Sequence, residues 1–381
     1  MKVVYSISDN IVSSLGFTTS DNMLALKNDR SGIGFHPGEF NLPEPFSAAL
    51  VDFKSLNKEF SAYSNVEKYT DFERLLISSV REAAAQTSID LASPETLFII
   101  STTKGNVSLL DSQSTFGKER VNLWASANEI QHFFKNPNEP IVVSQACISG
   151  VSAIILAKMY LESGLYKHVV VTGGDKLSKF IVSGFQSFKA LSMNNCKPFD
   201  MERDGLSLGE GAATIILGIA GEEELKPNSV AIKSGSTSND ANHISGPSRT
   251  GEGLYRAILR TLKDTDPAEL GFINAHGTAT PYNDEMEAIA ISRAGLETLP
   301  VNSLKGYFGH TLGAAGLIET IVCSHSLMNS QLIKCKGFST KGVTTNINVI
   351  TENIDFKGSG CLKMASGFGG CNAVIQLKRY N

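Results

Sequence analysis

The sequence lacks a hydrophobic run long enough to cross a bilayer. Its most apolar helix candidates are interrupted by Lys158, Glu319 or His325, whereas a spanning helix needs about 20 predominantly apolar residues. The first residues, Met1–Ser6, are not a charged segment followed by a long apolar stretch, so no signal peptide is expected. We therefore expect no membrane span.

Cysteine pairs and basic tracts are also lacking. Six cysteines are spread over 381 residues, with no C-x-x-C pair and no Cys/His spacing typical of zinc. This pattern favours free thiols in a reducing cytoplasm, and we expect no metal site. The formal net charge is only −4, and no basic tract or RNP-like motif is present, so no nucleic-acid partner is expected.

The chain does contain enough apolar residues for a large core. Hydrophobic residues make up 42% of the sequence, which argues against disorder. A length of 381 residues allows two or three average domains or one large duplicated fold.

A repeated order of predicted elements favours the duplicated α/β fold. Strand-like runs at 97–101, 141–144 and 168–174 are matched in the second half by runs at 271–276, 300–304 and 362–370. The middle run of each set is followed by an apolar helix pattern, over 151–161 and 312–327 respectively. The segment 221–227 interrupts the pattern, so we expect two halves, 1–220 and 221–381.

Three reactive side chains follow strand-like runs. Cys147 comes after 141–144 and precedes a helix, while His276 and His310 lie in Gly- and Thr-rich connections of the second half. Because α/β folds place chemistry at the carboxyl ends of strands, we expect the thiol and the two imidazoles to meet. A helix amino terminus favours a thiolate, so we expect a lowered pKa for Cys147, the best nucleophile candidate.

A thiolate beside two imidazoles is suited to acyl transfer. The thiolate can hold an acyl group as a thioester, and the imidazoles can donate hydrogen bonds to an enolate or move a proton. Lys305 and Glu319 could form a charged pair that holds this region in place. The run Gly367–Gly370 offers backbone N–H groups suited to an oxyanion hole.

Other candidate residues have weaker signals. Asp284 and Glu287 share a helix face by their spacing, which indicates structural hydrogen bonding. Ser207 lies in a G-x-S-x-G pattern, but a charged segment precedes it and a strand-like run follows, so a hydrolase nucleophile is not expected. His243 is either a substrate contact or a loop residue.

Taken together, these motifs resemble those of the β-ketoacyl-acyl-carrier-protein synthases, the elongating Cys-His-His condensing enzymes of the thiolase superfamily. The resemblance covers the chain from about residue 140 onward, and the first 95 residues match only loosely. The matching stretches are Ala146-Cys147-x-Ser-Gly150, Lys197-Pro-Phe-Asp200, Arg203-Asp-Gly205, Gly209-Glu-Gly211, Asn274-Ala-His276-Gly-Thr-x-Thr280-Pro, Asp284-x-x-Glu287, Ser303-x-Lys305-x-x-x-Gly-His310-x-x-Gly-Ala-Ala-Gly316 and Gly367-Phe-Gly-Gly370-x-Asn372.

The resemblance implies a thiolase-like, five-layered α-β-α-β-α fold made of two duplicated halves, usually in a homodimer. It implies that Cys147 accepts the acyl group and that His276 and His310 assist decarboxylation of a malonyl thioester. Lys305, braced by Glu319, would order the histidine region.

The resemblance also implies how the substrate is held. The N–H groups of Cys147 and Phe368 would form the oxyanion hole, the Phe368 side chain would gate the acyl pocket, and Gly369 would lie on the substrate side. Thr278 and Thr280 would contact the phosphopantetheine arm. That arm arrives on an acyl carrier protein, so no cofactor is expected.

Departures from the family pattern bear on substrate range. Ile148 and Cys371 stand where threonine is usual, and the amino-terminal region and 337–350 are short. These features favour a specialised synthase, for a polyene or polyketide-like product, over housekeeping fatty acid elongation. Lys68 and Lys197 are candidates for carrier-protein docking.

Alternatives remain at this point. His310 favours decarboxylative elongation, because the resemblance implies that initiating synthases of the family have asparagine at the equivalent position. A non-decarboxylating thiolase or acyltransferase is the second hypothesis. The third is a non-catalytic partner subunit that sets chain length, although such relatives lack the nucleophile. A heterodimer with a related synthase subunit is the alternative to a homodimer.

Overall fold

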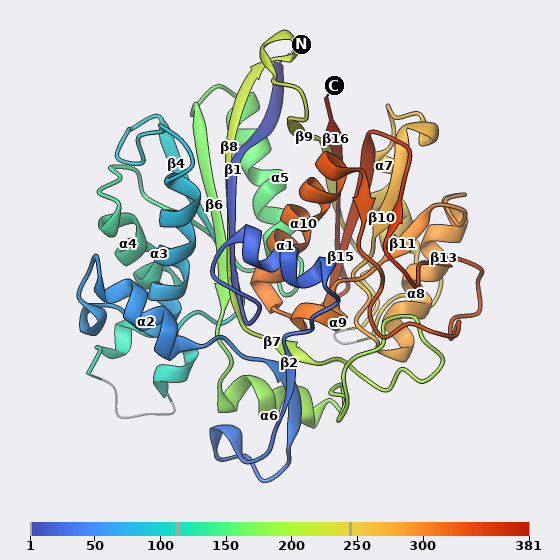
Figure 1. The fold of residues 1–381 in the computed structure, drawn as a ribbon, viewed down its shortest axis with the longest axis horizontal. Helices are drawn as coiled ribbons and strands as arrows, with labels where there is room; N and C mark the ends of the chain where they lie inside the picture. Colours follow the sequence, from blue (N-terminus) through green and yellow to red (C-terminus); the bar gives the residue numbers. More distant parts are fainter. Residues whose placement is uncertain (1, 111–114, 244–245, 381) are drawn as a thin grey trace.

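Eleven of the strands that the structure describes are hydrogen-bonded into one continuous sheet (Figure 1). The computed structural model describes residues 2–110, 115–243 and 246–380. One side of the sheet consists of β5 (Ile141–Val143), β4 (Thr96–Ser101), β6 (His168–Asp175), β8 (Gly211–Gly221) and β1 (Lys2–Ser13). The other side consists of β9 (Val230–Asn239), β16 (Cys371–Arg379), β15 (Gly360–Gly367), β10 (Leu270–Asn274), β11 (Pro300–Asn302) and β13 (Asn348–Val349).

The two sides repeat one topology. In the order β5-β4-β6-β8-β1, the first three strands are parallel and the last two pairings are antiparallel. The order β11-β10-β15-β16-β9 has the same sequence of parallel and antiparallel pairings. The two half-sheets meet where Tyr5 of β1 pairs with Ala231 of β9. The duplicated α/β fold expected from the sequence is thereby confirmed.

Helices form the other three layers. The central layer consists of α5 (Ser149–Glu162) and α10 (Ala315–Asn329), which pack against each other and against strands of both half-sheets (Figure 1). One outer layer contains α3 (Asp71–Ala84) and α4 (Leu123–Phe133), and the other contains α7 (Glu252–Thr261) and α8 (Pro281–Arg293). The predicted five-layered arrangement is therefore confirmed.

The remaining elements lie around these layers. They are α1 (Thr19–Lys27), α2 (Phe53–Ser61), α6 (Lys179–Ser187), α9 (Lys305–Phe308), the small sheet of β2 (Ile33–His36), β3 (Phe46–Ala49) and β7 (Leu208–Gly209), and the pair β12 (Gln331–Leu332) and β14 (Ile354–Asp355).

Two glycines allow the central helices to touch backbone to backbone. A Cβ atom on Gly150 of α5 would lie 2.9 Å from the Leu317 nitrogen, and one on Gly316 of α10 would lie 2.8 Å from the Val151 nitrogen. Any side chain here would push the helices apart. The loops that precede α5 and α10 carry Cys147 and His310, so this close crossing brings the two halves of the predicted site together.

Helix α3 shows how a local signal sets an element boundary. The Thr70 hydroxyl accepts a hydrogen bond from the Glu73 N–H at 3.2 Å, and the Glu73 carboxylate accepts one from the Thr70 N–H at 3.0 Å. This is a capping box, the arrangement that the sequence pattern Thr70-Asp-Phe-Glu73 is typical of. The apolar face of the helix is buried against the outer side of the first half-sheet.

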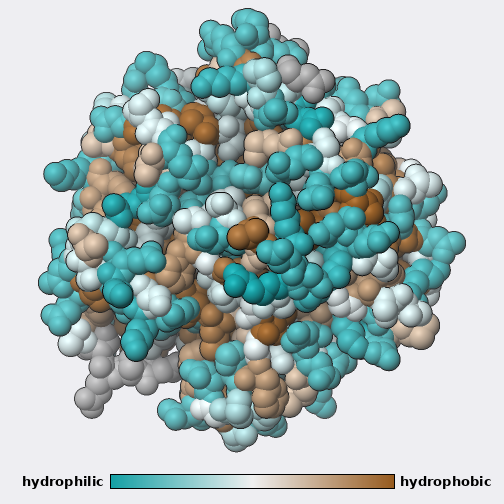
Figure 2. Space-filling model, viewed as in Figure 1, coloured by the Kyte–Doolittle hydropathy of each residue, from teal (hydrophilic) through white to brown (hydrophobic). Residues whose placement is uncertain are grey.

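The face of the molecule that Figure 2 shows is mainly polar. Hydrophobic side chains are exposed on it in small groups, as is normal for a globular protein. Among the residues that the structure describes, no helix is both long and apolar enough for a membrane span.

Candidate active site

Cys147 lies in the tight turn between β5 and α5. The turn is held by the Ser149 hydroxyl, which donates to the Ala146 carbonyl at 2.6 Å and accepts from the Gln145 N–H at 2.8 Å. Ala146 adopts a positive φ of 47°, a strained conformation for a residue with a Cβ. The Cys147 side chain is nearly buried, with 8% of the residue exposed, and accepts a hydrogen bond from the backbone N–H of Phe368.

The expected low pKa of Cys147 is wrong for this conformation. Burial raises the pKa of the thiol to about 12, although the positive charge of Lys305 and the Phe368 N–H act in the opposite direction. Desolvation disfavours the thiolate more strongly than the helix amino terminus and its neighbours favour it. The thiol is therefore protonated at neutral pH in this structure, and its attack on an acyl group requires removal of the proton.

His276 lies in the turn that follows β10, and carboxylates of α8 hydrogen-bond to the backbone of this turn. Glu287 accepts hydrogen bonds from the backbone N–H groups of His276 and Gly277, at 2.7 and 2.6 Å. Asp284 accepts from the Thr278 N–H at 3.0 Å. Burial raises the pKa of Glu287 to about 7 and that of Asp284 to about 6. Both carboxyls thus fix the backbone of the turn rather than face the cavity.

The surroundings of His310 select one tautomer. Its Nδ1 accepts a hydrogen bond from the Leu312 N–H at 3.3 Å, so the neutral ring carries its proton on Nε2. Nε2 is buried and has no hydrogen-bond partner among the described residues. An unused donor at this position can serve a developing negative charge on a substrate.

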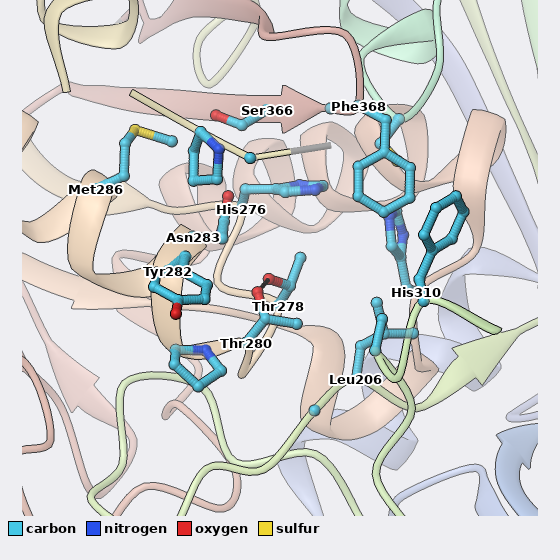
Figure 3. A pocket seen from close by; sticks show the side chains of 18 of the residues that line it. Leu206, His276, Thr278, Thr280, Tyr282, Asn283, Met286, His310, Ser366 and Phe368 are labelled. Atoms are coloured by element: carbon cyan, nitrogen blue, oxygen red, sulfur yellow. Dashed lines mark hydrogen bonds between the residues drawn. The ribbon is translucent and has the colours of Figure 1, made fainter. Parts of the chain in front are cut away.

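The three predicted residues come together. The Cys147 sulfur and one nitrogen from each of His276 and His310 all lie within 4.8 Å of one another. The two imidazoles meet edge to face, with ring centroids 5.0 Å apart and an interplanar angle of 84° (Figure 3). Burial, and then the positive charges of Lys305 and Lys363, hold the pKa of both imidazoles well below the usual range, so both rings are neutral.

A buried ionic cluster lies behind the imidazoles. Lys305 and Glu319 form the pair expected from the sequence, with Nζ 2.6 Å from Oε1. A second lysine, Lys363 of β15, lies 2.7 Å from the other carboxylate oxygen of Glu319. Sequence reasoning missed Lys363. The available signal was a single charge within an otherwise apolar strand, Leu362–Ala365.

A cavity of about 490 Å³ opens above these groups. Thr278 and Thr280 line it, with their hydroxyls hydrogen-bonded to each other at 2.8 Å (Figure 3). His243 also lines the cavity, and its Nδ1 accepts from the Gly246 N–H at 3.0 Å. Ile148 is fully buried in the core, and neither it nor Gly369 is among the lining residues.

Aromatic rings stand at the mouth of this cavity. The Phe368 ring, on a residue 38% exposed, contacts the rings of Phe185 and Phe188, with centroids 5.9 and 5.5 Å apart. Phe185 and Phe188 belong to α6 and its carboxyl cap and were not singled out from the sequence. The signal available in the sequence was their close spacing within one short segment that also contains Phe180.

Two other cysteine and serine candidates have structural surroundings. The Ser207 hydroxyl accepts from the Cys196 N–H at 3.0 Å and donates to the Asn194 carbonyl at 3.2 Å, so it is used in a loop. Cys371 lies beside the site, with its sulfur 3.2 Å from the Phe368 carbonyl oxygen.

The donor set of Cys147, His276 and His310 could in principle ligate a metal ion. A dication would have to bind beside Lys305 and Lys363, both of which are fully buried. Their positive charge opposes such binding, so we assign no metal to the site.

Comparison with known families agrees with this arrangement. The family model described as "Beta-ketoacyl synthase, N-terminal domain" matches residues 4–220, and that of the C-terminal domain matches residues 229–339. The chain therefore belongs to the β-ketoacyl synthase family.

Individual relatives are similar to this chain in sequence. A 3-oxoacyl-[acyl-carrier-protein] synthase 2 from Rhizobium meliloti is 32% identical over 68% of this chain and 65% of the relative. The Staphylococcus aureus protein of the same name is 31% identical over 65% of this chain, and the match spans 62% of that relative's length.

Solved structures match over the whole chain. The complex of the ketosynthase ApeO with its chain length factor ApeC from Xenorhabdus doucetiae matches with a TM-score of 0.88 and 25% identity, covering 100% of this chain and 98% of that one. A β-ketoacyl synthase from Burkholderia phymatum STM815 matches with a TM-score of 0.84 and 23% identity over 100% of both chains.

Proposed function

We propose that this protein is an acyltransferase that catalyses a decarboxylative Claisen condensation. An acyl group bound to Cys147 is joined to a malonyl unit on acyl carrier protein, and the product is a β-ketoacyl thioester two carbons longer. The observation that carries the proposal is the convergence of the Cys147 sulfur and the two neutral imidazoles within 4.8 Å at one cavity.

The first half-reaction loads the enzyme. The Cys147 sulfur attacks the carbonyl carbon of an acyl thioester, and the thiol proton leaves with the phosphopantetheine sulfur. The N–H groups of Cys147 and Phe368 would bind the tetrahedral oxyanion. Support for the oxyanion hole comes from Gly367, where an added Cβ would lie 3.0 Å from the Cys147 nitrogen, so the two backbone segments are in contact.

The second half-reaction forms the carbon–carbon bond. The malonyl thioester loses carbon dioxide, and the Nε2–H of His310, together with His276, donates to the thioester oxygen as the enolate forms. The enolate carbon attacks the acyl-Cys147 carbonyl, and the Cys147 thiolate leaves. Neutral imidazoles suit this step because each can donate a hydrogen bond without a net charge.

Several features are part of the same proposal. The phosphopantetheine arm would pass Thr278 and Thr280, and the reaction would use no cofactor of its own. Acyl carrier protein is the proposed partner. Similar structures include a ketosynthase in complex with its chain length factor and a ketosynthase in complex with an acyl-carrier protein. Three features of the whole protein stay predictions: the homodimer or heterodimer, the cytoplasmic location and the division at residues 220/221. The roles of four residues also stay predictions, namely those of Ile148, Gly369, Lys68 and Lys197.

Intact-mass analysis of the purified chain tests the proposal. Given an acyl thioester, the wild type should gain one acyl group, and Cys147→Ala should gain none while it keeps its fold. Cys371→Ala is the matched control, because it removes the neighbouring thiol and should still be acylated. Acylation of Cys147→Ala would show that the nucleophile is misassigned, and an unmodified wild type would favour the non-catalytic partner subunit.

A further inference from the structure

The buried ionic cluster contains more positive than negative charge. Glu319 is the single anion, and each of its carboxylate oxygens faces one lysine, Lys305 at 2.6 Å and Lys363 at 2.7 Å. Both lysine side chains are fully buried, and that of Glu319 is 4% exposed. Two cations and one anion leave one excess positive charge that water does not screen.

Such an arrangement is unfavourable for folding alone. Burying an ion carries a desolvation penalty even in a relaxed protein, and a pair only partly offsets it. Lys305 already neutralises Glu319, so ion pairing does not explain the second lysine. Lys363 also donates to the Met364 carbonyl, which holds its ammonium in place.

The position of Lys363 relates it to both imidazoles. It pairs in register with Asn274 on the neighbouring parallel strand β10, two residues before His276. Glu319, to which it is paired, lies on α10, the helix that follows the His310 loop. Lys363 therefore lies in the half-sheet directly behind the catalytic turn.

We propose that Lys363 is a positioning residue whose buried positive charge, added to that of Lys305, keeps His276 and His310 in the neutral form that donates a hydrogen bond to the enolate. Glu319 offsets the charge of one lysine, so the presence of Lys363 beside Lys305 leaves one positive charge in excess. This assignment rests on the proposed function for its purpose, but the electrostatic effect itself does not.

The titratable and charged groups packed around the two catalytic turns come from several elements. The cations are Lys305 of α9 and Lys363 of β15, and the anionic or ionisable groups are Glu319 of α10, Glu287 and Asp284 of α8, Asp175 at the end of β6, and Cys147 before α5. Lys305 and Lys363 both lower the pKa of each imidazole, after burial itself.

Charge-balanced variants test the proposal through the histidines themselves. In Lys363→Met the cluster becomes neutral overall, and NMR titration should show the imidazole pKa values of His276 and His310 raised by about one unit or more. The acidic limb of malonyl decarboxylation should move to higher pH by the same amount. Lys363→Arg should retain the wild-type titration.

The double variant Lys363→Met/Glu319→Gln separates charge from packing. It restores the single excess positive charge through Lys305, so both imidazoles should titrate close to wild type. Lys378 lies on the neighbouring strand β16, and its ammonium is paired to Glu269. Lys378→Met should leave both titrations unchanged.

The outcomes are decisive in each direction. Unchanged imidazole titration in a folded Lys363→Met protein would overturn the proposal, as would equal shifts in the single and double variants. If Lys363→Met does not fold, the same comparison is made with Lys363→Gln. Lys363→Met could shift both imidazole titrations while the wild type is neither acylated nor able to decarboxylate a malonyl thioester. That result would support the electrostatic role and reject the proposed function.

Discussion

His310 shows, at the scale of single residues, how a backbone hydrogen bond prepares a side chain for chemistry. The Leu312 N–H occupies Nδ1, and the free Nε2–H is left for the substrate. We expect His310→Ala to lower carbon dioxide release from a malonyl thioester by about 10²- to 10⁴-fold, the usual contribution of such a group. Acylation of Cys147 should change by less than about tenfold, because its oxyanion contacts are separate.

The two half-reactions of this variant can be followed separately. Carbon dioxide release reports decarboxylation, and intact mass reports acylation. His325→Ala is the matched control, since its imidazole pairs with Asp9 at 3.1 Å, outside the cavity lining. Equal losses in both half-reactions would mean that His310 supports the fold of the site rather than one chemical step.

The types and sequence positions of the reactive residues could be predicted, but their electrostatics could not. Cys147, His276 and His310 each follow a strand-like run, and the strand-end rule alone brings them to one place. The raised pKa of Cys147 depends on burial by segments far along the chain, which no local pattern reveals. Lys363 went unrecognised because a lysine in a strand is ordinarily read as surface-exposed.

At the scale of elements, helix α6 and its carboxyl cap position the Phe368 ring, because Phe185 and Phe188 contact it. A ring contact of this kind contributes about 0.5–1.5 kcal/mol. We expect Phe188→Ala to loosen the Phe368 ring and to speed alkylation of Cys147 by iodoacetamide by about 2- to 10-fold. The readout is the rate at which the alkylated mass appears.

Phe180 provides the control on the same helix. It is 55% exposed and makes no ring contact with Phe368 among the described residues, so Phe180→Ala should alkylate at the wild-type rate. Equal rates in all three proteins would show that the ring contact does not limit access to the thiol.

Elements with a strong periodic or capping signal were the predictable ones. Helix α3 begins at its capping box, and the helix patterns at 151–161 and 312–327 correspond to α5 and α10. Strand β9 was not predicted, because its run Lys233–Asn239 is small and polar. It is a strand because β16 pairs with it along its length, a tertiary effect that overrides local propensity.

At the scale of the whole molecule, the duplication of the α/β half determines where the candidate active site lies. The equivalent strands β5 and β11 each lead into a connection that precedes a central helix, and those helices cross at Gly150 and Gly316. The internal symmetry therefore places Cys147 from one half beside His310 from the other. The repeated order of elements predicted that Cys147 and His310 lie near each other. The close contact of the two helices at Gly150 and Gly316 could be seen only in the structure.

Stability should depend on pH through carboxyls that the fold buries, and Glu210 is the clearest case outside the site. It accepts hydrogen bonds from the Val51 and Leu177 N–H groups, both at 2.9 Å, and burial raises its pKa from 4.5 to about 7. Between these two values the folded protein binds more protons than the unfolded chain, so the contribution of Glu210 to the free energy of unfolding falls as the pH rises.

Replacement of this carboxyl isolates its effect from that of the buried imidazoles, which act in the opposite sense below pH 6.5 because their pKa values are lowered. Relative to wild type, Glu210→Gln should gain about 3 kcal/mol in free energy of unfolding between pH 4.5 and pH 7.5. Urea unfolding at four or five pH values measures this difference. A difference that stays constant with pH would show that Glu210 titrates normally in the folded protein, and that the two backbone N–H groups fully offset its burial.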